Sequence, residues 1–195
     1  IDLVEEVARV HGLEKIPFTL PLRSAMSGRL SQSQRLRRLV EDVLVGAGLF
    51  EAYTLSLVAR DPDPEALRLP VPLTSEHGVL RTTLLDGLVA AAAHNLAVGN
   101  EEIALFEIAR VYLPSGEQLP DEHWRVGAIA QGGYSRAKGA VETLYEALGI
   151  EPVLERTRLP FLHPGKAAAL EAGWVGEVHP ALLEGEWGVF ELDLD

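Results

Sequence analysis

The chain has 195 residues, of which 47% are hydrophobic, enough for one sizeable core, and no apolar run approaches the roughly 18 residues that span a bilayer. It contains no Cys, which excludes disulfides, thiolate metal sites and a cysteine nucleophile and fits a reducing, cytoplasmic compartment. Acidic residues outnumber basic ones 29 to 17, for a formal net charge of −12. This charge argues against the chain being the main nucleic-acid-binding segment of a protein.

The chain opens with a predicted amphipathic helix over residues 2–12, which Gly12 ends. Its apolar residues recur at helical spacing: Leu3, Val7 and Val10. Because this helix is already running at Ile1, we expect the chain to be a piece of a longer protein. The carboxylates of Asp2, Glu5 and Glu6 share one face of the helix, and the helix dipole favours acidic residues at this end.

A loop with Pro17, Pro21 and a flexible run at 24–28 is the best candidate for a domain boundary. We expect residues 1–22 to be the end of a preceding domain with its linker. Residues 23–195 are then the main domain.

Helix signals resume after this loop. Ser31 and Gln34 fit a capping box, and apolar residues then repeat at helical spacing as far as Ala47. Residues 50–57 alternate between apolar and polar, which predicts a strand, and the Asp-Pro-Asp-Pro run at 61–64 predicts a turn.

The next helix is predicted from its ends. Thr82 or Thr83 is placed to cap it, Asp86 lies in its first turn, where the dipole favours negative charge, and Gly99 ends it. Residues 103–113 are almost wholly apolar, which predicts a long strand at the centre of a sheet.

The remaining elements complete a mixed fold. They are a strand at 125–131, a helix at 135–149, a hairpin at 167–178, one helical turn at 181–184 and a strand at 189–194. Helices flank strands that are joined mainly by hairpins and turns, which predicts an α+β fold with an antiparallel sheet.

Three other features could carry chemistry, and each has a structural alternative that we favour. For Gly132-Gly133 the alternatives are a phosphate-binding loop and, as we favour, a simple turn. His163 and His179 are a metal or acid–base pair or, since each precedes Pro, two turn anchors. The basic cluster at 35–38 is most simply a solvated helix face.

Six strings of the sequence resemble, in the same order and spacing, the β chain of bacterial phenylalanyl-tRNA synthetase. They lie at 72–88, 105–112, 138–142, 163–166, 176–180 and 189–193, and begin PLTSEHG, LFEIARVY, KGAVE, HPGK, GEVHP and VFELD. Asp86 stands where that family usually has Pro, and Lys166 where it usually has Arg. Residues 2–12 resemble the end of the domain that precedes the core, so the resemblance covers nearly the whole chain.

This resemblance implies a class II aminoacyl-tRNA synthetase-like core within phenylalanine–tRNA ligase, which attaches phenylalanine to its tRNA using ATP. It implies that the active site and the bound ATP belong to the α subunit, that two α and two β chains assemble, and that the helix at 31–47 forms part of the subunit interface. Binding of tRNA is expected mainly through other regions.

In that family, the residues that match Asp2, Glu5 and Glu6 are magnesium ligands, together with an Asp further upstream. A cluster of hard oxygen ligands suits Mg²⁺. Because the upstream Asp is not in this sequence, we expect the chain alone not to hold the ion.

Catalytic class II cores use two arginines to bind the phosphates of ATP, one on the second motif strand and one after a Gly-rich strand. At these places the sequence has Glu107 with Arg110, and Glu191 with Asp193 and Asp195. Carboxylates repel phosphates, so we expect no catalytic and no cofactor-binding residues in this chain. The alternatives are a free-standing regulatory or RNA-binding relative of the synthetase fold and a self-sufficient adenylate-forming enzyme.

Overall fold

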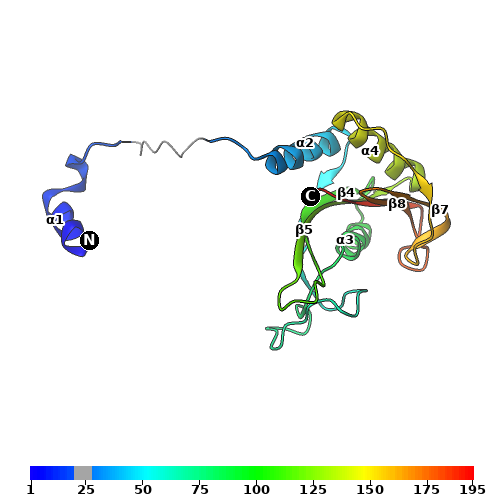
Figure 1. Ribbon diagram of the computed structural model, residues 1–195, viewed down its shortest axis with the longest axis horizontal. Helices are drawn as coiled ribbons and strands as arrows, with labels where there is room; N and C mark the ends of the chain where they lie inside the picture. The colour runs from blue at the N-terminus through cyan, green and yellow to red at the C-terminus, as the bar shows by residue number, and fades with distance from the viewer. Residues whose placement is uncertain (20–27) are drawn as a thin grey trace. The chain divides into compact units, whose positions relative to one another are not determined.

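A computed structural model describes residues 1–19 and 28–195, in two units, Ile1–Leu30 and Ser31–Asp195 (Figure 1). The helices are α1 (Asp2–His11), the 3₁₀ helix η1 (Leu13–Lys15), α2 (Gln32–Gly46), α3 (Leu85–Ala97) and α4 (Gly133–Leu148). The strands are β1 (Phe50–Glu51), β2 (Leu57–Val58), β3 (Val79–Leu80), β4 (Ala104–Leu113), β5 (Asp121–Gln131), β6 (Glu155–Arg156), β7 (Leu162–Leu170), β8 (Gly173–Val178) and β9 (Trp187–Asp193). Most of the predicted boundary loop, including Pro21, lies outside the described residues.

The first unit contains α1 and η1, separated by Gly12 at a φ of 102°. The predicted helix and its end are therefore confirmed. Its apolar residues stay exposed, with Leu3 82%, Val7 69% and Val10 80% accessible.

The described residues of the second unit form a seven-stranded sheet in the order β1-β4-β5-β9-β8-β7-β6. The β1–β4 pair is parallel, and the other neighbours are antiparallel. Strands β2 and β3 pair separately. The predicted α+β fold with an antiparallel sheet is confirmed.

Helices cover both faces of this sheet: α2 and α4 pack on one face and α3 on the other (Figure 1). Successive strand residues alternate between the two layers, as the pleat requires. Phe106 and Phe190 face α2 and α4, whereas Ile129 and Val189 face α3.

The capping box that begins α2 is present as predicted. The Ser31 hydroxyl accepts a hydrogen bond from the N–H of Gln34 at 3.2 Å, and the Gln34 side chain accepts one from the N–H of Ser31 at 2.9 Å. No helix within residues 1–19 and 28–195 is long and apolar enough to cross a membrane.

The strand predicted over 50–57 is wrong in extent. Only Phe50–Glu51 joins the sheet, and the chain leaves it after Ala52, whose N–H donates to the Phe106 carbonyl at 2.7 Å. Tyr53 and Leu55 are 83% and 65% exposed, so the alternation there marks a surface segment and not a half-buried strand.

Two other expectations also need correction. Strand β4 is second from one edge of the sheet and not central, and its apolar character reflects helices packed on both of its faces. Residues 181–184 form a turn and not a helical turn, with the Leu182 N–H donating to the His179 carbonyl at 2.9 Å.

Candidate functional site

Glu107 lies on the α3 face of the sheet, and it is at the first of the two places where the resemblance implies an ATP-binding arginine in catalytic relatives. The side chain is 1% exposed and forms an ion pair with Arg81, whose Nη1 donates to Oε1 at 3.0 Å. The Thr54 hydroxyl donates to Oε2 at 2.6 Å. Arg81 also donates through Nε to the Arg110 carbonyl at 3.1 Å, so the cation of this buried pair is held by the backbone as well.

Glu191 lies on the same face, two strands away on β9. Its Oε1 accepts a hydrogen bond from Arg125 Nη1 at 2.6 Å. Its Oε2 accepts one from the Thr83 hydroxyl at 2.6 Å and one from the Leu84 N–H at 2.9 Å. A carboxylate of the sheet thus caps the N-terminus of α3, where the helix dipole favours negative charge.

Neither predicted capping residue occupies the N-cap position of α3, which is Leu84. Thr83 accepts a hydrogen bond from the Leu85 N–H at 3.1 Å. Thr82 instead bonds Asp61 through its N–H at 2.7 Å and its hydroxyl at 2.6 Å. The main cap of α3, Glu191, is not visible in the sequence near the helix.

Sequence reasoning missed the cations of this face. Arg81 and Arg125 come from positions far from the two expected places, and each is already held by a buried glutamate. Arg110, the arginine that the sequence named at the first place, lies on the opposite face of the sheet, where it forms an ion pair with Glu122 and lies over the ring of Trp124. The face therefore carries guanidinium groups, but buried carboxylates already bind them.

A third buried glutamate supports the opposite face. Glu177 is 5% exposed, and Lys166 Nζ lies 2.7 and 2.8 Å from its two oxygens. Its Oε2 also accepts the Tyr134 N–H at 3.1 Å, in the first turn of α4. The hydrogen bond to Glu177 raises the pKa of Lys166 and keeps that amine charged.

Gly132-Gly133 forms the turn that we favoured. Both N–H groups donate to the Glu186 carbonyl at 3.1 Å, and both residues have positive φ. At Gly133 a Cβ atom would lie 2.6 Å from Glu177 Oε2, so this position requires glycine. At the start of α4 the Tyr134 N–H is thus already bound by the carboxylate of Glu177.

His179 also acts as a turn anchor, whereas His163 lies within β7, where the register with β8 shifts, and not in a turn. Nδ1 of His163 accepts the Gly165 N–H at 3.2 Å, and Nδ1 of His179 accepts the Ala181 N–H at 3.2 Å. Each ring thus fixes the backbone two residues further on.

The predicted magnesium ligands Asp2, Glu5 and Glu6 lie in the first two turns of α1 and are exposed. Glu6 forms an ion pair with Arg9 one turn later. In the part of the chain that the structure describes, the carboxylates of Asp2, Glu5 and Glu6 do not belong to any group of three ligand atoms that lie within 4.8 Å of one another.

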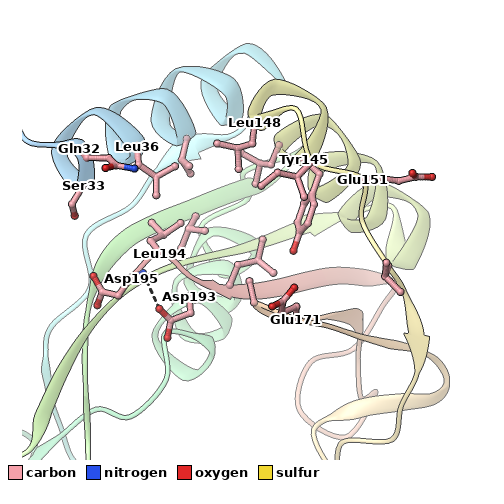
Figure 2. Close-up of a pocket in the computed structure, with 17 residues that line it drawn as sticks. Gln32, Ser33, Leu36, Tyr145, Leu148, Glu151, Glu171, Asp193, Leu194 and Asp195 are labelled. Atoms are coloured by element: carbon pink, nitrogen blue, oxygen red, sulfur yellow. Dashed lines mark hydrogen bonds between the residues drawn. The ribbon is translucent and has the colours of Figure 1, made fainter.

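A groove of about 980 Å³ opens between α2, α4 and the sheet (Figure 2). Leu36 of α2 and Leu148 of α4 face into it, and the described residues that line it include no Lys or Arg. Burial, and secondarily the charge of Glu171, raises the pKa of Tyr145 on its wall. An apolar groove with an acidic edge does not suit ATP.

Comparison with known proteins connects this geometry to a family. The family model described as the phenylalanyl tRNA synthetase beta chain CLM domain matches residues 16–194. Two curated proteins named phenylalanine–tRNA ligase beta subunit, from Staphylococcus aureus strains bovine RF122 / ET3-1 and MRSA252, are 35% identical to the chain over 226 aligned positions. The match covers 100% of this chain but only 28% of those relatives.

A solved structure supports the fold. Desulfitobacterium hafniense PylSc, a pyrrolysyl tRNA synthetase, is similar with a TM-score of 0.67 and 17% sequence identity, over 99% of this chain and 72% of that one. At this identity the likeness concerns the fold alone, and it confirms the synthetase-like architecture expected from the sequence.

Proposed function

Because the chain belongs to the phenylalanyl-tRNA synthetase β-chain family, we propose that it is a non-catalytic structural core within a phenylalanine–tRNA ligase. The observation that carries this proposal is the pairing of Glu107 with Arg81 and of Glu191 with Arg125. A class II core that forms an adenylate uses guanidinium groups to bind the phosphates of ATP, and these two are engaged by buried carboxylates. The ligase as a whole joins phenylalanine to its tRNA with ATP, which binds to the α subunit.

The α subunit is the proposed partner, in an assembly of two α and two β chains. Large apolar side chains support an interface directly after α2: Phe50, Tyr53 and Leu55 are 71%, 83% and 65% exposed. Such an exposed group of apolar side chains is typical of a protein–protein contact. Within α2 itself, Leu39 and Val45 are 38% and 55% exposed.

Magnesium and tRNA belong to the assembled enzyme in this proposal. Asp2, Glu5 and Glu6 supply exposed carboxylate oxygens, which are the donors that Mg²⁺ prefers, and the ion commonly keeps several waters. They would hold it only together with ligands from elsewhere in the enzyme. The ion would offset the like charges of these carboxylates. We place the enzyme in the cytoplasm, consistent with a chain without Cys.

Co-purification tests the partner. The full-length β subunit should bring down the α subunit, and the double variant Tyr53→Ser, Leu55→Ser should weaken that capture. A matched variant, Val71→Ser with Leu73→Ser, changes two apolar residues that are 88% and 102% exposed elsewhere in the fold and should leave it unchanged. Equal capture by all three proteins would refute the proposed interface.

ATP–pyrophosphate exchange separates this proposal from an adenylate-forming enzyme. The β subunit alone should show no exchange, and the αβ assembly should show it. Tight, salt-sensitive binding of tRNA by residues 31–195 alone would favour the RNA-binding alternative.

A further inference from the structure

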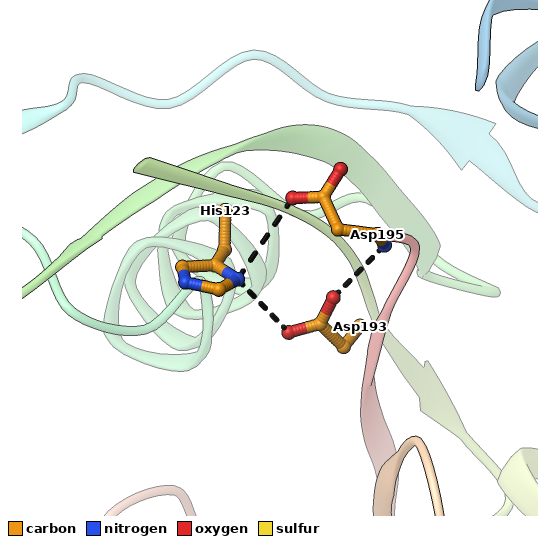
Figure 3. Close-up of side chains that lie close together, drawn as sticks. All are labelled: His123, Asp193 and Asp195. Carbon is orange, nitrogen blue, oxygen red and sulfur yellow. Dashed lines mark hydrogen bonds and ion pairs between the residues drawn. The ribbon is translucent and has the colours of Figure 1, made fainter. Parts of the chain in front are cut away.

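His123, Asp193 and Asp195 converge at the end of the sheet where β5 pairs with β9 (Figure 3). Arg125 pairs with Asp193 in the antiparallel register, so His123 lies two residues further along on the same face. Asp195 likewise lies two residues after Asp193. The strand pleat therefore brings three potential metal ligands together on one side of the sheet.

The histidine lacks a hydrogen bond at the atom that faces the two carboxylates. Its Nδ1 is buried and has no hydrogen-bond partner among the described residues. This atom lies 3.5 Å from Asp193 Oδ2 and 3.8 Å from Asp195 Oδ2, too far for good hydrogen bonds. A buried polar atom without a partner is costly, and an ion bound between these groups would satisfy it.

Backbone groups hold both carboxylates in place. Asp193 Oδ1 accepts the N–H of Asp195 at 2.9 Å, and Asp195 Oδ2 accepts the N–H of Trp124 at 2.9 Å. Such outer hydrogen bonds orient metal ligands in known sites. The side chains of His123, Asp193 and Asp195 are 36%, 33% and 41% exposed, so water can complete the coordination of an ion.

One cation competes for this position. Arg125 Nε lies 3.9 Å from Asp193 Oδ2. However, Glu191 holds the same guanidinium through Nη1 at 2.6 Å. Because Glu191 already neutralises Arg125, the carboxylates of Asp193 and Asp195 keep a net negative charge that a bound cation would neutralise.

We propose that His123, Asp193 and Asp195 bind a divalent transition-metal ion of the zinc type that joins the start of β5 to the end of β9. One imidazole nitrogen with two carboxylate oxygens suits Zn²⁺, Co²⁺ or Mn²⁺, whereas Mg²⁺ and Ca²⁺ prefer oxygen ligands alone. A tetrahedral ion with bonds of about 2.1 Å places its ligands about 3.4 Å apart. The two spacings from His123 Nδ1, 3.5 and 3.8 Å, are close to this value, and all three ligand atoms lie within 4.8 Å of one another. This site shares no residue with the proposed α-subunit surface or with Asp2, Glu5 and Glu6, so its test does not depend on the proposed function.

Cobalt binding to the full-length β subunit tests the site. Co²⁺ should give a d–d absorption spectrum, Zn²⁺ should abolish it by competition, and millimolar Mg²⁺ should not. His123→Gln and Asp193→Asn should each lower Zn²⁺ affinity by on the order of tenfold or more, since even outer-shell changes have effects of that size. His94→Gln, which changes an exposed histidine on α3, is the matched control and should bind as the unmodified protein does.

Thermal unfolding provides a second measurement. Zn²⁺ should raise the Tm of the unmodified protein and of the His94→Gln control, and this rise should disappear in both site variants. If both site variants bind the same number of Co²⁺ ions with the same spectrum as the control, the site does not exist. In that case the three residues make only the side-chain contacts at 3.5 and 3.8 Å and bind no ion.

Discussion

Glu191, in the last strand of the sheet, accepts a hydrogen bond at 2.9 Å from the backbone N–H of Leu84, 107 positions earlier in the chain. Through this bond the sheet fixes the start of α3 directly. The same carboxylate binds Arg125, so one buried side chain links two strands and a helix.

Replacing Glu191 with Gln should therefore destabilise the fold by about 2–3 kcal/mol, because an amide NH₂ would then face N–H and O–H donors. Urea unfolding measures this change. Glu146→Gln, on the exposed side of α4, makes the same chemical change and should stay within about 0.5 kcal/mol of the unmodified chain. Equal stability of the two variants would refute the capping role.

The Arg81–Glu107 pair should show strong coupling in a double-mutant cycle. Arg81→Met alone should cost roughly 3–5 kcal/mol, because it leaves a carboxylate that is 1% exposed without its cation. Arg81→Met combined with Glu107→Leu should recover part of that loss.

The Arg110–Glu122 pair is the matched control for this cycle. It has the same residue types, but its side chains are 47% and 45% exposed, so its coupling should be below about 1 kcal/mol. Similar coupling energies for the two pairs would contradict the assignment of Glu107 as a buried structural anchor.

Two glycines of neighbouring elements should respond in opposite directions to Ala. At Gly188 of β9, a Cβ atom would lie 2.1 Å from the Gly133 carbonyl oxygen and 2.9 Å from Ala137 Cβ, so Gly188→Ala should cost about 2–3 kcal/mol. At Gly139 of α4, no atom lies within 4 Å of a new Cβ, and Gly139→Ala should stabilise the helix by about 0.5–1 kcal/mol. Chemical denaturation of both variants checks the contrast, which a stable Gly188→Ala protein would disprove.

Asp86 should make stability depend on pH. Its pKa is raised, first by burial and then by the negative charges of Asp61 and Glu191. A raised carboxyl pKa means that ionised Asp86 destabilises the folded state, and this cost is lost as the pH falls through the raised pKa to the ordinary value of about 3.9. Asp86→Asn should then stabilise the chain at pH 7 and have no such effect at about pH 3. Thermal unfolding at both pH values measures this, and a loss of stability at pH 7 would show that the helix dipole outweighs burial.

Local signals in the sequence predicted the helices well. Residues Ser31 and Gln34 identified the start of α2, and the apolar spacing before Gly99 identified α3, because caps and helical periods depend on near neighbours. The strand at 50–57 failed for the opposite reason. Whether Tyr53 enters a sheet depends on Glu107, which binds Thr54 from 53 positions away.

The candidate site was predicted only in part. The sequence located Glu107 and Glu191 on the relevant strands, but their cations come from 26 positions before the first and 66 positions before the second. Nor did any local pattern connect His123 with Asp193, since only the pairing of β5 with β9 brings them together. Partners at such distances in the chain leave no periodic signal in a single sequence.

The buried glutamates also restrict how this chain could evolve. A variant that bound nucleotide through Arg81 and Arg125 would have to release both from their glutamates, and that release would remove support from α3 and the sheet at the same time. The two ion pairs therefore make such a gain of function costly in stability.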